Sequence, residues 1–438
     1  MTAADLGAGI GAGDIDPVDL AETYLAAIAA HPLRDRIYAR VTADRARAEA
    51  AAARDRAGAG LRRGPLDGVP VSWKDLFDTA GVATEAGTKL LEGRVPGRDA
   101  AVLQAATAAG LVCLGKTHMS EIAFSGLGLN PMTATPPCRN DANAVAGGSS
   151  SGAAASVAFG LAAAAIGSDT GGSVRIPAAW NDLVGLKTTH GLLPMQGVVP
   201  LCQSFDTIGP LCRTVTDAAL VTAALGGHMA PDLTGASLRG LRLMTLETVV
   251  MDDVHATPLQ AFDRAVARLA EAGATIARVA FPPLTEAFDM SGTLYAAESY
   301  GWWRSAVEAA PEKMFPQILE RVRGGRSVSG PDYVAAWIRL REIRADFLAA
   351  TAGYDAVIMP TAPILPPNID RLLQDDAYYK AQNLLALRNT RVANLMDLVS
   401  VTLPTDVPSC GILFNMARGA EGRLLRLGAA AERVVAGA

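Results

Sequence analysis

Two serine- and glycine-rich stretches decide how this sequence is interpreted: Gly147-Gly-Ser-Ser-Ser-Gly152 and Gly167-Ser-Asp-Thr-Gly-Gly-Ser-Val-Arg175. The alanine-rich segment 152–167 joins them and predicts one buried helix. Adjacent glycines leave backbone N–H groups unshielded, and such groups can stabilise an oxyanion from about 3 Å away. We therefore expect both stretches to fold back to one site, although glycine-rich turns alone would need the same residues.

Short apolar runs alternate with helical patterns on both sides of these stretches. Strands are predicted at 69–73, 111–114, 241–245, 274–281, 356–359 and 399–403. Helices are predicted at 16–28, 42–57, 100–109, 257–272 and 421–435, with a mainly helical insertion at 284–350. This alternation is typical of an α/β fold built around a sheet, and no clear linker divides the chain.

The composition excludes several classes of protein. Half of the 438 residues are apolar and 19% are charged, with 39 Lys and Arg against 44 Asp and Glu and a net charge of −5. These values exclude a disordered or fibrous chain, and without a basic block we expect neither nucleic acid nor membrane as a partner. Five scattered cysteines without a C-x-x-C pair predict reduced thiols, and no signal peptide is recognised, so we expect a cytoplasmic protein.

Two familiar motifs match by letter but not by context. Residues 110–117 fit the phosphate-loop pattern, yet their interior is itself an apolar strand that follows a helix. Residues 148–152 fit the nucleophile elbow G-x-S-x-G, yet no apolar strand precedes them and no downstream histidine has a suitable setting. Both nucleotide binding and a histidine-based hydrolase are therefore disfavoured.

A serine nucleophile needs a base, and the sequence offers a lysine. Lys74 directly follows the apolar run 69–73, where an ammonium group is costly unless it is paired or neutral. Burial lowers the pKa of a lysine and can make it a general base near neutral pH. A salt bridge to Asp75 or Asp78 explains the same placement at least as well.

The residues from 147 to 217 resemble the amidase signature family. Both serine stretches are in register with Gly185-Leu-Lys187, Asp206-x-x-Gly-Pro210 and Arg213-x-Val-x-Asp217, and the match reaches back through 115–130 to Lys74-Asp75. The resemblance implies an α/β fold with a central mixed sheet flanked by helices on both faces. It also implies one domain, 1–438, with N-terminal helices in 1–63, the signature core in 64–220 and a C-terminal part in 221–438.

The same resemblance implies an amidase that forms an acyl-enzyme through a Ser–cis-Ser–Lys triad. Ser173 would be the nucleophile, Ser149 the bridging serine after a cis peptide bond, and Lys74 the base. Four backbone N–H groups would form the oxyanion hole: those of Thr170, Gly171, Gly172 and Ser173. Four further residues would bind substrate or support the site: Arg175, Asp169, Ser150 and Gly148. The reaction would need no metal and no organic cofactor.

The sequence departs from the family pattern outside the triad. Asp182 stands where many relatives have glycine, Thr188 where proline is common, and Cys138-Arg139 where Asn-Pro is usual. The C-terminal region also lacks the common Gly-Leu-Pro-x-Gly turn. These departures bear on the substrate pocket, which segments 124–135 and 290–303 would build. The second segment holds an aromatic group that suits core packing or a ligand wall: Tyr295, Tyr300, Trp302 and Trp303.

Several functional alternatives stay open at this point. The resemblance implies a small-molecule amide as substrate and is compatible with a homodimer. It fits a free-standing amidase, but also the glutaminase component of a tRNA amidotransferase, which uses the same fold to release ammonia from glutamine. A catalytically silent binding protein is a third interpretation. Arg175 would either favour a carboxylate-bearing substrate or serve as a structural partner of Asp169.

Overall fold

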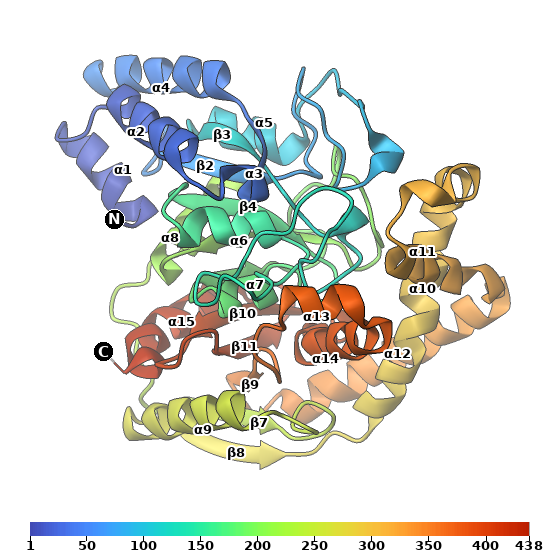
Figure 1. The fold of residues 1–438 in the computed structure, drawn as a ribbon. Coiled ribbons are helices and arrows are strands. Elements are labelled where there is room, and N and C mark those ends of the chain that lie inside the picture. The colour runs from blue at the N-terminus through green and yellow to red at the C-terminus, as the bar shows by residue number, and fades with distance from the viewer. Residues whose placement is uncertain (438) are drawn as a thin grey trace.

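The computed structural model describes residues 1–437, which contain one sheet of eleven strands (Figure 1). The strands are β1 (Tyr38–Val41), β2 (Pro70–Lys74), β3 (Val112–Thr117), β4 (Ala164–Asp169), β5 (Val184–Lys187), β6 (Thr207–Cys212), β7 (Arg242–Leu246), β8 (Thr275–Val279), β9 (Ala356–Pro360), β10 (Leu398–Pro404) and β11 (Gly411–Ala417). Their order in the sheet is β1-β3-β2-β4-β6-β5-β10-β11-β9-β7-β8.

The sheet is mixed, as the resemblance implies. β2 runs parallel to β3 and β4, and β7 runs parallel to β8 and β9. Between these two parallel groups, neighbouring strands from β4 to β9 are all antiparallel. One continuous sheet therefore connects the N-terminal and C-terminal parts of the chain.

Helices cover both faces of the sheet. One layer holds α2 (Pro17–Ala30), α3 (Arg34–Ile37), α4 (Ala43–Gly58), α6 (Ser151–Ala158), α7 (Arg175–Trp180), α13 (Ile369–Gln374) and α14 (Asp376–Leu395). The other holds α1 (Ala3–Ala12), α5 (Ala101–Ala108), α8 (Val215–Gly226), α9 (Ala256–Glu271) and α15 (Glu421–Ala436). Among the helices described, none is long and apolar enough to cross a bilayer.

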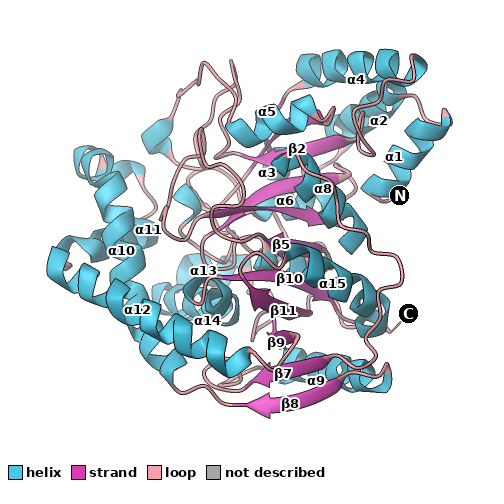
Figure 2. Cartoon of the chain, turned by 180° about the vertical axis from the view of Figure 1, so that it is seen from behind, coloured by secondary structure: helices cyan, strands magenta, loops and turns pink. Residues whose placement is uncertain are grey.

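The helical insertion lies beside the ends of the strands rather than on a face. It consists of α10 (Pro283–Ala309), α11 (Pro316–Arg323) and α12 (Gly330–Thr351). Figure 2 shows these helices together on one side of the molecule, away from both chain termini. α10 also packs against α14, so the insertion meets the layer that contains α7.

The single helix predicted over 152–167 is wrong. α6 ends at Ala158, Gly160 takes the left-handed conformation with φ +77°, and 164–169 form β4. β4 lies between β2 and β6 with all six residues buried, so sheet pairing overrides the helix propensity of alanine. The strand returns the chain toward the start of α6, which brings the two serine stretches together.

The phosphate-loop motif has a plain structural role. Gly115, Lys116 and Thr117 lie inside β3. A phosphate loop needs its Gly-Lys-Thr at the start of a helix, where free N–H groups face the phosphate. The fold therefore agrees with the rejection of that motif.

Candidate active site

Lys74 is the last residue of β2 and has no solvent exposure. Its ammonium nitrogen donates to Ser149 Oγ at 2.6 Å and to Ser168 Oγ at 2.8 Å. Burial lowers the pKa of Lys74 from 10.5 to about 7, against the nearby charges of Asp169 and Asp206, which raise it. A large fraction of this lysine is neutral at neutral pH and can accept a proton from the serine that it contacts.

The salt bridge considered for Lys74 is not formed. Asp75 instead accepts from Lys116 at 3.1 Å, and Asp78 pairs with Arg94 at 2.6 Å. Both carboxylates are thus engaged by other cations, which leaves Lys74 to the serines.

The two serine stretches meet beside Lys74. The peptide bond between Gly148 and Ser149 is cis, and the Ser150 N–H donates to the Ser173 carbonyl oxygen at 3.2 Å. Ser173 lines a cavity of about 230 Å³ and is 3% exposed. Within residues 1–437 no hydrogen bond joins the hydroxyls of Ser149 and Ser173. Hydrogen bonds between catalytic groups are often long without substrate and shorten when substrate binds.

The loop before Ser173 presents free N–H groups to the cavity. Thr170, Gly171 and Ser173 line it, and their N–H groups have no acceptor among the described residues. Gly172, which we expected in the oxyanion hole, is different because its N–H donates to Asp169 Oδ1 at 2.9 Å. Gly172 has φ +136°, and a Cβ there would collide with Thr390. Three of the four N–H groups expected in the oxyanion hole are therefore free to bind a ligand in the cavity, and the fourth is not.

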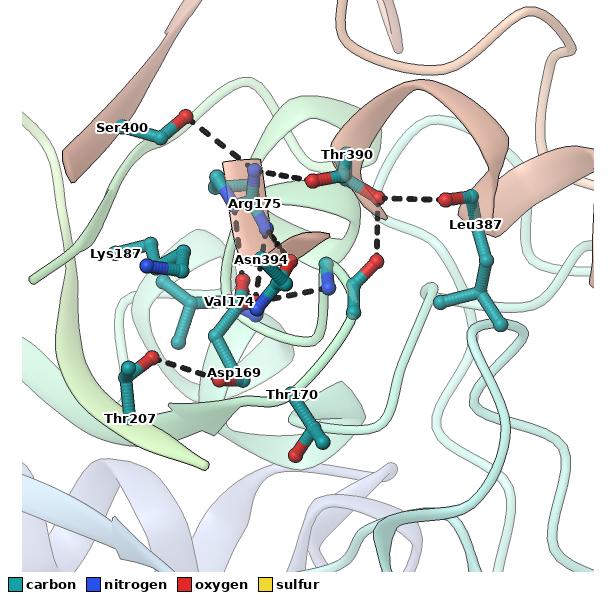
Figure 3. A network of polar contacts seen from close by, with 12 residues as sticks. Asp169, Thr170, Val174, Arg175, Lys187, Thr207, Leu387, Thr390, Asn394 and Ser400 are labelled. Atoms are coloured by element: carbon teal, nitrogen blue, oxygen red, sulfur yellow. Dashed lines mark hydrogen bonds and ion pairs between the residues drawn. The ribbon is translucent and has the colours of Figure 1, made fainter. Parts of the chain in front are cut away.

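A buried ion pair holds this loop (Figure 3). Besides Gly172 N–H, Asp169 accepts from the Val174 N–H at 3.1 Å and from two nitrogens of Arg175 at 2.9 and 3.0 Å. Burial alone would raise the pKa of Asp169, but Arg175, together with Lys187 and Asn394, lowers it to about 2. Asp169 is therefore a carboxylate at neutral pH.

Arg175 is a partner of Asp169 and does not line the cavity. Its side chain has no solvent exposure, and its remaining N–H groups donate to the Thr390 carbonyl, Asn394 Oδ1 and Ser400 Oγ at 2.7, 2.7 and 3.3 Å. A guanidinium has five N–H donors, and all five are engaged here. Arg175 is therefore a structural partner of Asp169 and is not placed to bind a carboxylate in the cavity.

The cavity wall comes partly from the predicted segments. Phe124 and Ser125 belong to 124–135, and Ser291, Gly292, Tyr295 and Ala296 belong to 290–303. Tyr295 donates its hydroxyl to the Thr170 carbonyl at 3.0 Å, so it also fixes the loop before Ser173. The other three aromatics of that group do not line the cavity: Trp303 bonds the Pro200 carbonyl, Trp302 is 52% exposed, and Tyr300 packs at the core edge.

Sequence reasoning missed the rest of the wall and one partner of Lys74. Arg321 on α11 and Leu384, Leu387 and Arg391 on α14 line the cavity. An arginine in a helical pattern carries no signal of its own, because most such residues face solvent. Ser168 lies within the second serine stretch, but only the sheet shows that its hydroxyl reaches Lys74.

The departure at Asp182 also has a local explanation. Asp182 takes φ +57°, which glycine adopts freely and aspartate tolerates better than most residues. Its carboxylate accepts from the Ser409 N–H and from Asn140 Nδ2, both at 2.8 Å. The side chain thus ties three loops together outside the cavity.

The mixed sheet with helices on both faces, the cavity lined by Ser173 and the buried lysine that contacts Ser149 define an α/β protein with the groups that serine-based hydrolysis requires. The Amidase family model matches residues 19–422. The chain is 35% identical over 411 residues to the 2-amino-5-chloromuconic acid deaminase of Comamonas testosteroni, covering 89% of this chain and 87% of that protein. It is also 35% identical over 447 residues to a glutamyl-tRNA(Gln) amidotransferase component from Anaeromyxobacter sp. (strain K), covering 93% and 89%.

Solved structures agree with these matches. The peptide amidase of Stenotrophomonas maltophilia superposes with a TM-score of 0.85 at 28% identity, covering 99% of this chain and 97% of that one. A further amidase crystal structure gives a TM-score of 0.89 at 29% identity, covering 99% and 100%. This chain belongs to the Amidase family and is an amidase-signature hydrolase.

Proposed function

We propose that this chain is a free-standing amidase that hydrolyses the C–N bond of a small amide through an acyl-enzyme on Ser173. The observation that carries the proposal is the 2.6 Å contact between Ser149 and the buried Lys74, whose pKa is about 7. A cavity of about 230 Å³ supports a small substrate, since it lies below the ~300–1,000 Å³ common for ligand pockets.

In the proposed mechanism, neutral Lys74 takes the proton of Ser149 while Ser149 takes that of Ser173. Ser173 Oγ attacks the amide carbon, a C–O bond forms, and the carbonyl electron pair moves onto oxygen. The N–H groups of Thr170, Gly171 and Ser173 stabilise that charge. Collapse of the intermediate breaks the C–N bond, and Lys74 returns the proton through Ser149 to the leaving nitrogen. Water then releases the carboxylate by the same route.

One feature of the cavity supports a free-standing amidase over the glutaminase component of an amidotransferase. Glutamine carries both an α-carboxylate and an α-ammonium group, and the ammonium group needs a negative counter-charge if it is buried. None of the described residues that line the cavity is acidic, whereas Arg321 and Arg391 are cationic. The named substrate of the Comamonas relative, an aminomuconic acid, is compatible with a cationic cavity.

The proposal is tested on the purified chain alone. We expect a fluorophosphonate probe to label Ser173, as located by mass spectrometry, and we expect ammonia release from a panel of small primary amides. Ser173→Ala should lose both. Ser156→Ala is a matched control, because Ser156 is equally buried but contacts Ser72 at 2.8 Å instead of the site.

The outcomes separate the three interpretations of the sequence. Labelling with ammonia release supports the free-standing amidase. Labelling without turnover of any amide, together with glutamine hydrolysis only after a partner protein is added, would indicate the amidotransferase component. A folded chain that neither labels nor releases ammonia would be a silent binding protein.

A further inference from the structure

Two arginines line the cavity of Ser173 without an acidic partner. Arg321 comes from α11 and Arg391 from α14. In the part of the chain that the structure describes, neither forms an ion pair with a carboxylate. The groups that act on their charges are tyrosines and, for Arg321, the other arginine.

Each guanidinium is held by only part of its donor set. Arg321 Nη1 donates to the Phe124 carbonyl at 2.7 Å, and its guanidinium carbon lies 4.3 Å from the centre of the Phe124 ring. Arg391 Nη1 meets Ser291 Oγ at 3.4 Å, and its guanidinium carbon lies 6.0 Å from the Tyr295 ring. The remaining N–H groups of both have no acceptor within residues 1–437. Both side chains are therefore positioned while most of their donors stay free.

Two neighbouring cations in a half-buried wall are unfavourable without an anion. Burial, and to a smaller extent Arg391, lowers the pKa of Arg321 to about 10, so Arg321 remains a cation at neutral pH. Other arginines of the insertion do have carboxylate partners: Arg323 pairs with Glu308 at 2.7 Å and Arg339 with Glu286 at 2.8 Å. Arg321 and Arg391 differ from these two in facing a cavity whose described lining holds no carboxylate.

We propose that Arg321 and Arg391 together bind a carboxylate on the acyl part of the substrate. The enzyme would then hydrolyse half-amides of small dicarboxylic acids and reject amides that carry an ammonium group. Guanidinium groups suit this task because their planar donors match a carboxylate, and the anion removes the repulsion between the two cations. The inference rests on the proposed amidase function and names its substrate class.

The first test compares three amides of one length: succinamate, its neutral analogue butyramide, and its α-amino derivative asparagine. We expect kcat/KM for succinamate to exceed that for each of the others by at least ~10-fold, because like and unlike charges are discriminated strongly in a desolvated site. In Arg321→Met and Arg391→Met the succinamate-to-butyramide ratio should fall toward one, mainly through KM. Arg323→Met, on the same helix but facing Glu308, should keep the ratio.

The second test does not need turnover. Succinate is titrated calorimetrically into the Ser173→Ala protein, with and without each arginine substitution. We expect succinate to bind, and either arginine substitution to weaken it at least ~10-fold, with no loss in melting temperature of the free protein. Equal binding by the variants, no binding at all, or asparagine as the preferred amide would overturn the proposal. If no amide is turned over but succinate binds through both arginines, only the proposed function fails.

Discussion

Replacing Lys74 by methionine should abolish catalysis and at the same time stabilise the protein. The two effects have one cause, because Lys74 is fully buried and contacts hydroxyls rather than a carboxylate. A lysine kept for packing or for a salt bridge would behave differently, since its loss would cost stability. Lys74→Met therefore separates a buried base from a structural residue.

The expected stabilisation follows from the pKa. Folding lowers the pKa of Lys74 from 10.5 to about 7. Each pH unit corresponds to about 1.4 kcal/mol, so burying this lysine costs roughly 4–5 kcal/mol at neutral pH. Methionine removes that cost but leaves the hydroxyls of Ser149 and Ser168 without their donor, a loss of about 1–3 kcal/mol. We expect a net gain of ~2 kcal/mol at pH 7.

The pH dependence fixes the sign of the effect. Between pH 7 and 10.5 the unfolded chain holds a proton on Lys74 that the folded chain has lost. The contribution of Lys74 to stability therefore rises with pH across this window, and the advantage of Lys74→Met should disappear as pH approaches 10.5. Urea denaturation of both proteins at pH 7 and pH 9.5 measures the change, while ammonia release should fall at least ~10³-fold.

Lys187→Met provides a matched control. Lys187 is equally buried, and burial lowers its pKa to about 7 as well, but its ammonium donates to the carbonyls of Thr188 and Leu398. We expect this variant to keep probe labelling at Ser173. A Lys74→Met protein several kcal/mol less stable than the parent at pH 7 would refute the reasoning, because it would mean that a charged, paired lysine had been removed.

Two further predictions concern the groups around the proposed base. The value of kcat/KM for a neutral amide should rise about tenfold per pH unit up to the pKa of Lys74, about 7, and then level off. Asp206→Asn should move the midpoint of this profile to lower pH, because Asp206 raises the pKa of Lys74. A midpoint that stays or rises in a pH–rate series would contradict this. Arg175→Met should cost roughly 3–5 kcal/mol in urea denaturation, because it leaves the Asp169 carboxylate buried and unpaired, and adding Asp169→Asn should recover part of that loss.

The sequence predicted those parts of the fold whose local patterns agree with their surroundings. The amphipathic helix expected at 257–272 is α9, and the buried run expected at 399–403 is β10. The helix prediction for 164–169 was wrong because alanine favours a helix locally, whereas pairing with β2 and β6 makes this segment a strand. The two partner strands lie far from 164–169 in the sequence, so no local pattern reveals the pairing.

The residues of the candidate site likewise fall into those that the sequence predicted and those that only the folded structure reveals. Lys74, Ser149 and Ser173 lie in or next to distinctive local motifs, and the structure brings Lys74 to Ser149, a pairing that the family resemblance implies and the local pattern alone left open. Arg321 and Arg391 are brought to the cavity only by the packing of α10, α11 and α14, far along the chain from the serines. The cavity wall therefore depends on tertiary structure that local motifs do not encode.

The buried pair of Asp169 and Arg175 links the shape of the loop before Ser173 to the pKa of Lys74, the proposed base. Ionisation strengthens the hydrogen bonds that Asp169 accepts from the N–H groups of Gly172 and Val174, yet its negative charge also raises the pKa of Lys74 and so opposes a neutral lysine. Arg175 pairs with Asp169 and keeps it ionised. The carboxylate thus holds the loop, while burial outweighs its charge and remains the largest influence on the pKa of Lys74.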